Sequence, residues 1–364
     1  MKTAIVTTTI NIPEALAGYA ESAKQYGHRD VAFIIIGDLK TPQGAKDFCE
    51  KLAKESSLEV LFLDVESQKS YLKKYPELLD FLPYNSDKRR NIGFLLAYEQ
   101  GAEKIITIDD DNFCLEGDFI GQHGIVGEIK SFDSIYSESG WFNVCSFLKE
   151  ARGQAFFHRG YPVQKRVKEH KIEQSIAQGK VAANAGLWLG DPDVDAVTRI
   201  AISPEAVGYK RQDNFFLAKG TWSPFDSQNV AFAREVIPAY FLSHHIGRDS
   251  DIWASYIVRK ITDHMGELVS YGRPLVKQLR NEHDLVSDLE QELDSMRLID
   301  RFCEHLRNIN LKGQSYKECF TVLVGKLGES FRQDESFSER DAVLLNNFCQ
   351  GLRVWAETID KVGS

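Results

Sequence analysis

The chain has 364 residues, 43% of them hydrophobic, and no tract of strongly biased composition, which suffices for one large core with a smaller appended unit. Its formal charge of −9 argues against a broad surface for nucleic acid or anionic membranes, although a local basic site could still bind phosphate. No apolar stretch approaches the roughly 20 residues that span a bilayer, and the sequence begins with a strand pattern rather than a signal sequence, so we expect a cytoplasmic protein. The six cysteines form no C-x-x-C pair, so neither a zinc site nor a disulfide framework is indicated.

The first third of the sequence alternates between strand and helix patterns. Strands are predicted over 4–10, 31–37 and 58–64, with helices over about 13–26 and 46–54. Such alternation is typical of a doubly wound, mostly parallel sheet, in which ligands bind at the carboxyl ends of the strands. No G-x-G-x-x-G or G-x-x-x-x-G-K-[ST] motif occurs, which argues against a dinucleotide oxidoreductase and a P-loop kinase.

A helix is predicted over 85–101, with Gly101 as its C-cap. Its first turn carries Lys88, Arg89 and Arg90, and cations at this position oppose the helix dipole. A bound anion explains them better than helix stability does. A solvated, charged helix face is the alternative for any one of them.

The strand over 105–108 leads directly into Asp109, Asp110 and Asp111. Three adjacent anions repel one another, and a fold tolerates them at the end of a buried strand mainly when a divalent cation or a row of donors offsets the repulsion. Mg²⁺ or Mn²⁺ held by carboxylates normally completes its coordination with water and phosphate oxygens, so a diphosphate is the expected partner. An acidic turn or a helix N-cap is the alternative.

After Asp111 the sequence is rich in glycine and aromatic residues at irregular spacing, as expected of substrate-binding loops and a mixed sheet. Asp249 and Asp251 lie beside an arginine and a tryptophan, a suitable arrangement for acid–base chemistry or for orienting an acceptor. Asp193 lies in an acidic loop that could be solvated at the surface or could contact a substrate.

The C-terminal segment, 286–364, has helical apolar spacing over 289–306, 316–327 and 341–362. A capping box is predicted at 336–339. We expect a helical module that supports a catalytic domain of residues 1–285, or an oligomer contact, without supplying chemistry.

Several motifs occur in the order found in one protein family. They are I-D-D-D at 108–111, R-G-Y-P at 159–162, G-L-W-L at 186–189, N-V-A-F at 229–232 and G-R-D-S-D-I-W at 247–253. On these motifs, roughly residues 3–285 resemble the reversibly glycosylated polypeptides, the family of UDP-arabinopyranose mutases. The segment from 81 to the acidic run also resembles the STELLO-type glycosyltransferases of plants. The C-terminal segment lies outside the resemblance.

The resemblance implies a GT-A fold, an α/β fold with a Rossmann-like, doubly wound mixed sheet. It also implies a UDP-sugar bound through a divalent metal, typically manganese, with magnesium as the other possibility. By position, the metal motif is Asp109, Asp110 and Asp111, and the nucleoside contacts are Thr8 and Asp38.

The resemblance also suggests the residues that handle the sugar. Arg159 matches the arginine that the mutases are understood to glycosylate reversibly, and Asp251 matches a carboxylate on the acceptor side. A free guanidinium is permanently protonated and a poor nucleophile, so Arg159 could equally clamp the diphosphate. The complete expected set of catalytic residues is Asp251, Arg159 and Asp249. The complete expected set of nucleotide-sugar contacts is Thr8, Asp38, Lys88, Arg90, Asp109, Asp193 and Asn229.

The sequence departs from the mutases at two positions. They have cysteine where this chain has Asn112, and histidine where it has Gln278. A late histidine is a usual metal ligand in GT-A enzymes, so the third protein ligand is open, with His283 or His264 as substitutes.

We therefore predict a metal-dependent enzyme that transfers a glycosyl unit from a nucleotide sugar to an acceptor that the sequence does not identify. The alternative is a UDP-sugar mutase that acts through reversible self-glycosylation. A non-catalytic sugar-nucleotide-binding scaffold is the third possibility, and the intact acidic run argues against it. A homo-oligomer could form through the C-terminal helices.

Overall fold

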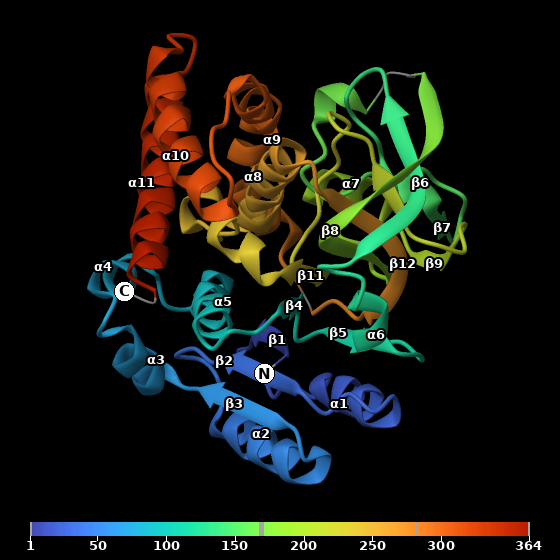
Figure 1. Ribbon diagram of the computed structural model, residues 1–364, viewed down its shortest axis with the longest axis vertical. Coiled ribbons are helices and arrows are strands. Elements are labelled where there is room, and N and C mark those ends of the chain that lie inside the picture. Colours follow the sequence, from blue (N-terminus) through green and yellow to red (C-terminus); the bar gives the residue numbers. More distant parts are fainter. Residues whose placement is uncertain (1, 167–170, 282, 363–364) are drawn as a thin grey trace.

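The computed structural model describes residues 2–166, 171–281 and 283–362 (Figure 1). The N-terminal third forms a parallel half-sheet in the order β3-β2-β1-β4. Helices α1 and α2 cover one side and α5 covers the other (Figure 1), which explains why the strands are almost continuously apolar. The strands are β1 Thr3–Thr8, β2 Val31–Ile36, β3 Glu59–Leu63 and β4 Lys104–Ile108. The helices are α1 Leu16–Gln25, α2 Gln43–Ser56, α3 Val65–Leu72, α4 Pro76–Phe81, the 3₁₀ turn η1 Asp87–Arg89 and α5 Arg90–Glu99.

The second half continues the same sheet with mixed strand directions. Beyond β4 the order is β11-β8-β6-β10-β12-β5, and β11 is antiparallel to β4. Strands β7 and β9 pair at the side of β8. The strands are β5 Asn112–Cys114, β6 Ile129–Ser137, β7 Leu148–Glu150, β8 Ile172–Gly190, β9 Ala206–Tyr209, β10 Phe215–Leu217, β11 Asn229–Ala233 and β12 Leu268–Gln278. The helices are α6 Phe119–His123, η2 Val144–Phe147, η3 Val163–Lys165, α7 Ala196–Ile202, η4 Arg234–Ala239, η5 His244–Asp249 and α8 Ser250–Met265.

Three long helices complete the chain: α9 Leu285–Asn308, α10 Tyr316–Gln333 and α11 Glu339–Lys361. They pack beside α8 and return the C-terminus to the neighbourhood of α4 (Figure 1). Trp253 of α8 stacks on Phe302 of α9 at a ring-centroid distance of 4.0 Å, and Phe348 of α11 packs edge-on against both, at 5.0 and 5.8 Å. Trp355 donates from Nε1 to the Pro238 carbonyl at 3.2 Å. The helices therefore share one hydrophobic core with the sheet domain.

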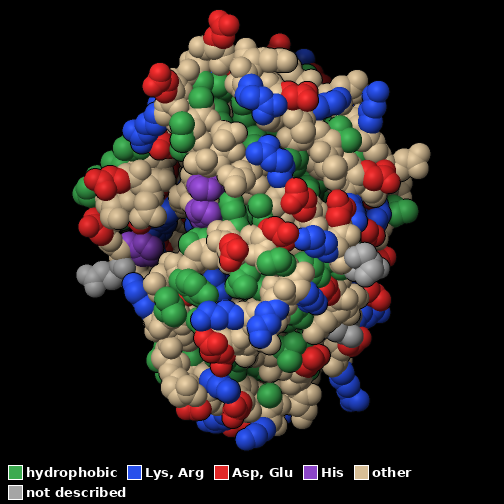
Figure 2. All heavy atoms as spheres, turned by 90° about the vertical axis from the view of Figure 1, so that its left-hand side faces the viewer, with side chains coloured by type: hydrophobic (Ala, Val, Ile, Leu, Met, Phe, Trp, Pro, Cys, Tyr) green, Lys and Arg blue, Asp and Glu red, His purple; other side chains and the backbone are tan. Residues whose placement is uncertain are grey.

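Over the face of the molecule shown in Figure 2, basic and acidic side chains alternate and hydrophobic ones form small, separate groups. Within the described ranges, no helix is both long and apolar enough to cross a bilayer.

The expected α/β class, with a doubly wound mixed sheet of the GT-A kind and a helical C-terminal segment, is confirmed. Two local details differ. The basic turn belongs to η1 and to the first residue of α5, so the predicted helix over 85–101 begins later, at Arg90. The capping box before α11 is formed by Ser338 and Asp341 rather than at 336–339, because Asp341 reaches both the backbone and the hydroxyl of Ser338.

Candidate functional site

The three carboxylates Asp109, Asp110 and Asp111 follow directly from the end of β4. Asp109 accepts a hydrogen bond from Arg90 Nη2 at 2.6 Å, and Asp110 accepts one from Thr9 Oγ1 at 2.6 Å. Burial raises the pKa of Asp109 to about 7 against the attraction of Arg90, and Asp111 adds to the rise. Burial, together with Asp110, raises the pKa of Asp111 to about 6. A bound cation would stabilise the charged forms of Asp109 and Asp111, whose pKa values are raised in its absence.

The oxygen atoms beside the acidic run fit a hard divalent cation. Oδ1 of Asp111 is buried and has no hydrogen-bond partner among the described residues, and the same is true of Gln278 Oε1. Gln278 ends β12 and pairs with Asn112 in the sheet, one residue beyond Asp111. Carboxylate and amide oxygens are the ligands that Mg²⁺ and Mn²⁺ prefer. Gln278 thus offers an oxygen where the mutases have histidine. His283 and His264 are both exposed, but only His283 lines the same cavity, and His264 lies near the end of α8.

Arg90 is held where the two halves of the sheet meet. Its guanidinium donates to Thr107 Oγ1 at 3.2 Å and to the Ser227 carbonyl at 3.0 Å. It also donates to Thr8 Oγ1 at 3.2 Å and to Asp109. The side chain is 4% exposed. Arg90 therefore fixes the acidic run as well as contributing positive charge beside it.

The expected nucleoside contacts lie at the neighbouring strand ends. Asp38 follows β2, and its carboxylate accepts hydrogen bonds from the backbone N–H groups of Leu39 at 2.7 Å and Ser86 at 3.0 Å. Lys88 is buried and its Nζ pairs with Asp87 at 2.7 Å. These side chains and the acidic run share one edge of the sheet, as the rule for strand ends predicts.

Arg159 is surrounded by three carboxylates. Its Nε and Nη2 donate to the two oxygens of Asp193 at 2.8 and 2.9 Å. Its Nη1 donates to Asp249 at 2.9 Å, and Nη1 and Nη2 donate to the two oxygens of Asp251 at 3.2 and 3.1 Å. Burial alone would lower the pKa of Arg159, but the carboxylates outweigh it and hold that pKa well above its ordinary value. The orientation of the guanidinium is consequently fixed.

A buried histidine lies behind this group. The ligand atoms of His158, Asp193 and Asp226 are within 4.8 Å of one another, a spacing compatible with a metal. Both oxygens of Asp193 already accept hydrogen bonds from Arg159, however, and the guanidinium would repel a cation there. Burial lowers the pKa of His158, but Asp226 and Asp193 outweigh it and the pKa lies above its ordinary value. The cluster is better described as an ion-paired support for Arg159, completed by the 2.7 Å hydrogen bond from Trp188 Nε1 to Asp226.

One cavity of about 770 Å³ joins the acidic run to Arg159. Ten of the twelve predicted site residues line it: Thr8, Asp38, Lys88, Arg90, Asp109, Asp110, Asp111, Arg159, Asp193 and Asp251. Asp249 is buried directly behind Arg159. Asn229 does not line the cavity, because its side chain points to the other face of β11 and bonds to His123 at 2.9 Å and to the Leu187 carbonyl at 2.8 Å.

Further residues line the cavity that sequence reasoning did not place there: Arg248 of η5 and, after β12, Arg280, Asp288 and Gln291. Arg248 and Arg280 both pair with Asp288 in the first turn of α9, and Gln291 follows one turn later. The strand-end rule could have located Arg280, which lies two residues beyond β12. No sequence signal placed α9 against this edge of the sheet.

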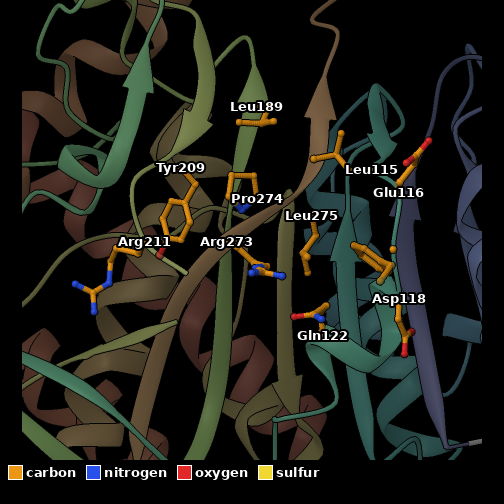
Figure 3. Close-up of a pocket in the computed structure, with 12 residues that line it drawn as sticks. Leu115, Glu116, Asp118, Gln122, Leu189, Tyr209, Arg211, Arg273, Pro274 and Leu275 are labelled. Carbon is orange, nitrogen blue, oxygen red and sulfur yellow. The ribbon is translucent and has the colours of Figure 1, made fainter. Parts of the chain in front are cut away.

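Two other hollows lie elsewhere. One, of about 320 Å³, is lined by Tyr209 and Arg211, by Leu115 and Asp118, and by Arg273–Leu275 of β12 (Figure 3). Its arginines already have partners, since Arg211 pairs with Asp133 and Arg273 donates to the Gln212 carbonyl at 2.8 Å. The other, of about 720 Å³, lies between β11 and α10 and is lined by four acidic and four basic side chains. Neither contains a residue predicted from the motifs.

A family model described as reversibly glycosylated polypeptide matches residues 68–363. UDP-arabinopyranose mutase 3 of Arabidopsis thaliana is 29% identical over 269 residues, which cover 71% of this chain and 68% of that protein. Probable UDP-arabinopyranose mutase 1 of Pisum sativum is 29% identical over 314 residues, or 80% and 81% of the two chains. The match runs through the C-terminal helices, so the expectation that 286–364 lies outside the resemblance is wrong.

Among solved structures, a mycobacterial protein aligns with a TM-score of 0.42 at 9% identity, covering 82% of this chain and 74% of that one. The mannosyltransferase PcManGT from Pyrobaculum calidifontis, in complex with GDP-Man and Mn²⁺, aligns with a TM-score of 0.38 at 8% identity, covering 99% and 86%.

Proposed function

Since the chain belongs to the reversibly glycosylated polypeptide family, we propose that it is a metal-dependent UDP-sugar mutase. That it is an enzyme of the UDP-sugar mutase or glycosyltransferase type follows from its relatives. One observation carries the proposal. A single cavity connects a carboxylate group suited to a metal diphosphate with an arginine held in a fixed orientation by three carboxylates.

The diphosphate of the donor would lie at the strand-end edge. Asp38 and Thr8 would contact the nucleoside, and Lys88 would lie beside the phosphates. A divalent cation held by the acidic run and Gln278 would supply Lewis-acid stabilisation of the charge that develops on the leaving diphosphate. Arg90 keeps Asp109 in position for this role.

The sugar would lie between the acidic run and Arg159. As the bond between C1 and the β-phosphate oxygen breaks, its electron pair stays on UDP. A guanidinium nitrogen forms a new bond to C1 and gives up one proton to a neighbouring carboxylate. While C1 is bound to nitrogen, the ring can open and close again through a different hydroxyl group. UDP then reclaims C1, and the arginine recovers its proton.

The burial of the site residues supports this chemistry. Arg159, Asp193 and Asp251 are 5%, 2% and 6% exposed. A mutase must keep water away from C1 while the donor is cleaved, since hydrolysis would destroy the intermediate. The low exposure of these carboxylates and of Arg159 favours that requirement.

Transfer to a separate acceptor, the function that we favoured from the sequence, is the second candidate. The hydrogen bonds of Arg159 support it, because all three guanidinium nitrogens already donate to carboxylates. A guanidinium held in this way is a poor nucleophile and a good clamp for a diphosphate. In that case Asp251 would act on the acceptor hydroxyl group.

Intact-mass spectrometry separates the two candidates. After incubation with manganese and a panel of UDP-sugars that includes UDP-arabinopyranose, a mutase should gain one glycosyl unit that is lost on adding UDP. Arg159→Lys should abolish the gain. Arg152→Lys is the matched control, because Arg152 lies in the same loop but is exposed and bonds to carbonyls outside the cavity. Transfer to an added acceptor without any mass shift would reject the mutase and favour the transferase.

A further inference from the structure

Two buried carboxylate oxygens beside Arg159 have no hydrogen-bond partner within the described chain. They are Oδ2 of Asp249 and Oε1 of Glu292, and both residues are 1% exposed. A buried carboxylate oxygen without a donor loses the hydrogen bonds it would make in water, and this loss is costly. Two such oxygens, both without a hydrogen-bond donor and both close to Arg159, therefore need an explanation.

The two carboxylates are brought together by the packing of α9 on η5. Glu292 is fixed through its other oxygen, which accepts a hydrogen bond from the backbone N–H of Ala196 at 2.7 Å. Ser295, one turn further along α9, accepts a hydrogen bond from Trp253 Nε1 at 2.9 Å and lies close enough to Asp249 to oppose the rise in its pKa. The two carboxylates are near enough that Asp249 raises the pKa of Glu292.

Burial and the neighbouring charges determine the pKa values of Asp249 and Glu292. Burial, and after it the neighbouring Asp249, raise the pKa of Glu292 to about 7, and burial also raises the pKa of Asp249. Arg248 Nη1 forms an ion pair with Glu292 Oε1 at 3.6 Å, a distance too long for a hydrogen bond, and this charge opposes the rise in the pKa of Glu292. Other charged groups surround Asp249, Glu292 and the Arg159 guanidinium. They are Asp193 from a loop, Arg248 from η5, Asp251 from α8 and Asp288 from α9.

Only Asp249, among the three carboxylates on Arg159, has an oxygen left for a proton. Both oxygens of Asp193 accept from Arg159. Both oxygens of Asp251 do so as well, and they accept further bonds from Ile252 and Ser227. Asp249 accepts from Arg159 through Oδ1 alone.

We propose that Asp249 and Glu292 form the proton-accepting pair for the Arg159 nucleophile. As a guanidinium nitrogen bonds to C1, its N–H proton passes to the carboxylate of Asp249 and is shared with Glu292, while the electron pair of the broken C1–O bond leaves on UDP. The return step reverses each transfer, so atoms and charge balance without an added reagent. This inference rests on the proposed mutase function. It makes Asp249 a catalytic residue and Glu292 a positioning residue.

The pair must be unprotonated to accept the proton. The single-turnover rate of adduct formation should therefore rise with pH through about 7, the range in which Glu292 loses its proton. Glu292→Gln keeps the acceptor for the Ala196 N–H but cannot take up a proton. We expect it to slow adduct formation by about 100-fold and to remove the rise near neutral pH.

Rapid-quench mass spectrometry of the manganese-loaded protein with the productive UDP-sugar measures both effects. Glu290→Gln is the matched control, since Glu290 is exposed on the same helix and should leave the rate and the pH profile unchanged. The UDP affinity of Glu292→Gln, measured by calorimetry, should equal that of the parent chain. An unchanged rate and pH profile in Glu292→Gln would overturn the inference and leave the mutase intact.

Two further outcomes are distinguishable. If the unaltered chain binds UDP but never forms an adduct, both the arginine intermediate and the proton-accepting pair are wrong. If Glu292→Gln fails to fold, infrared spectroscopy of the unaltered chain with manganese and UDP replaces it. A protonated carboxyl band that disappears as the pH rises through about 7 supports the pair. Absence of that band over the same range overturns it.

Discussion

Asp109 and Asp111 are two residues apart but have different surroundings. Asp109 accepts the 2.6 Å hydrogen bond from Arg90, whose guanidinium is buried where β1, β4 and the segment before β11 meet. Asp111 has an oxygen without a partner among the described residues. The first carboxylate therefore contributes to folding, whereas the second is available to a ligand.

Substitution by asparagine should separate these roles. Asp109→Asn removes the charge opposite Arg90 and should lower the free energy of unfolding, but by less than the roughly 3–5 kcal/mol typical of a broken buried ion pair, because burial already raises the pKa of Asp109 to about 7. Asp111→Asn removes one of the repelling anions and should leave the metal-free chain at least as stable as before. Both variants should lose manganese-dependent UDP binding. Thermal unfolding and calorimetric titration of UDP with and without manganese measure these effects, and unchanged UDP binding in Asp111→Asn would contradict the metal site.

Single residues were predictable from the sequence where the strand-end rule applied. Thr8 ends a parallel strand, Asp38 and the acidic run follow parallel strands, and all of them line one cavity. The rule does not cover Asn229, because Asn229 begins β11, which is antiparallel to β4. Successive side chains along a strand face opposite sides of the sheet, and Asn229 faces the side away from the cavity. The adjacent Gln228 lines the cavity instead. The roles assigned to individual residues stay predictions.

The loop that carries Arg159 depends on a glycine. Gly160 has φ +70°, and a Cβ atom built there would be 2.2 Å from Ile252 Cγ2 at the start of α8. Its carbonyl also accepts a hydrogen bond from Tyr256 at 3.0 Å. The glycine of the R-G-Y-P motif thus lets the loop approach α8, and this approach brings Arg159 to Asp251.

Gly160→Ala should be destabilising for two reasons. The left-handed backbone costs about 1–2 kcal/mol for a residue with a side chain, and overpacking against Ile252 adds about 1–3 kcal/mol. Gly153→Ala is the matched control, because Gly153 lies in the same loop at φ +74° and has no atom within 4 Å of its Cβ position. Its free energy of unfolding should fall only by the backbone contribution of about 1–2 kcal/mol. Chemical denaturation measures both variants. Equal losses would show that contact with α8 does not hold the loop.

Helix α9 has a different role from the one expected of its segment. We predicted three C-terminal helices that support the fold without supplying chemistry, and three helices are present. The side chains of Asp288 and Gln291, however, lie in the cavity wall. The apolar periodicity of the sequence predicted the helix but not its partner, because packing of α9 on η5 depends on contacts far away in the chain. The boundary between residues 285 and 286 remains a proposal.

At the scale of the whole molecule, α11 supports the site from a distance. Phe348 packs against Trp253, whose indole N–H bonds to Ser295 on α9. Phe348 itself is 1% exposed and does not line the cavity. The apolar stripe predicted from the sequence is therefore buried within the chain, and an oligomer contact and a cytoplasmic location stay predictions.

Phe348→Ala should test this support. The loss of a buried aromatic side chain should cost about 3–5 kcal/mol of unfolding free energy. The affinity for UDP and manganese of the folded protein should be unchanged, since the substitution removes no cavity residue. Val343→Ala, on the same helix but 62% exposed, should be close to neutral. Thermal melting and calorimetry measure the two properties, and a loss of UDP affinity in folded Phe348→Ala would show that α11 shapes the donor site directly.

The position of Arg90 also has a consequence for the order of folding. Its bonds to Ser227 join residues 137 positions apart, and the neighbouring Asn91 bonds to Leu242 across 151 positions. Contacts between such distant parts of a chain form slowly, because a long loop must close before they contribute. The N-terminal strands and helices can form from local sequence, but the cavity at the strand ends is complete only after the segment before β11 has docked. A nascent chain would therefore acquire its N-terminal secondary structure before the cavity that contains Arg90 is formed.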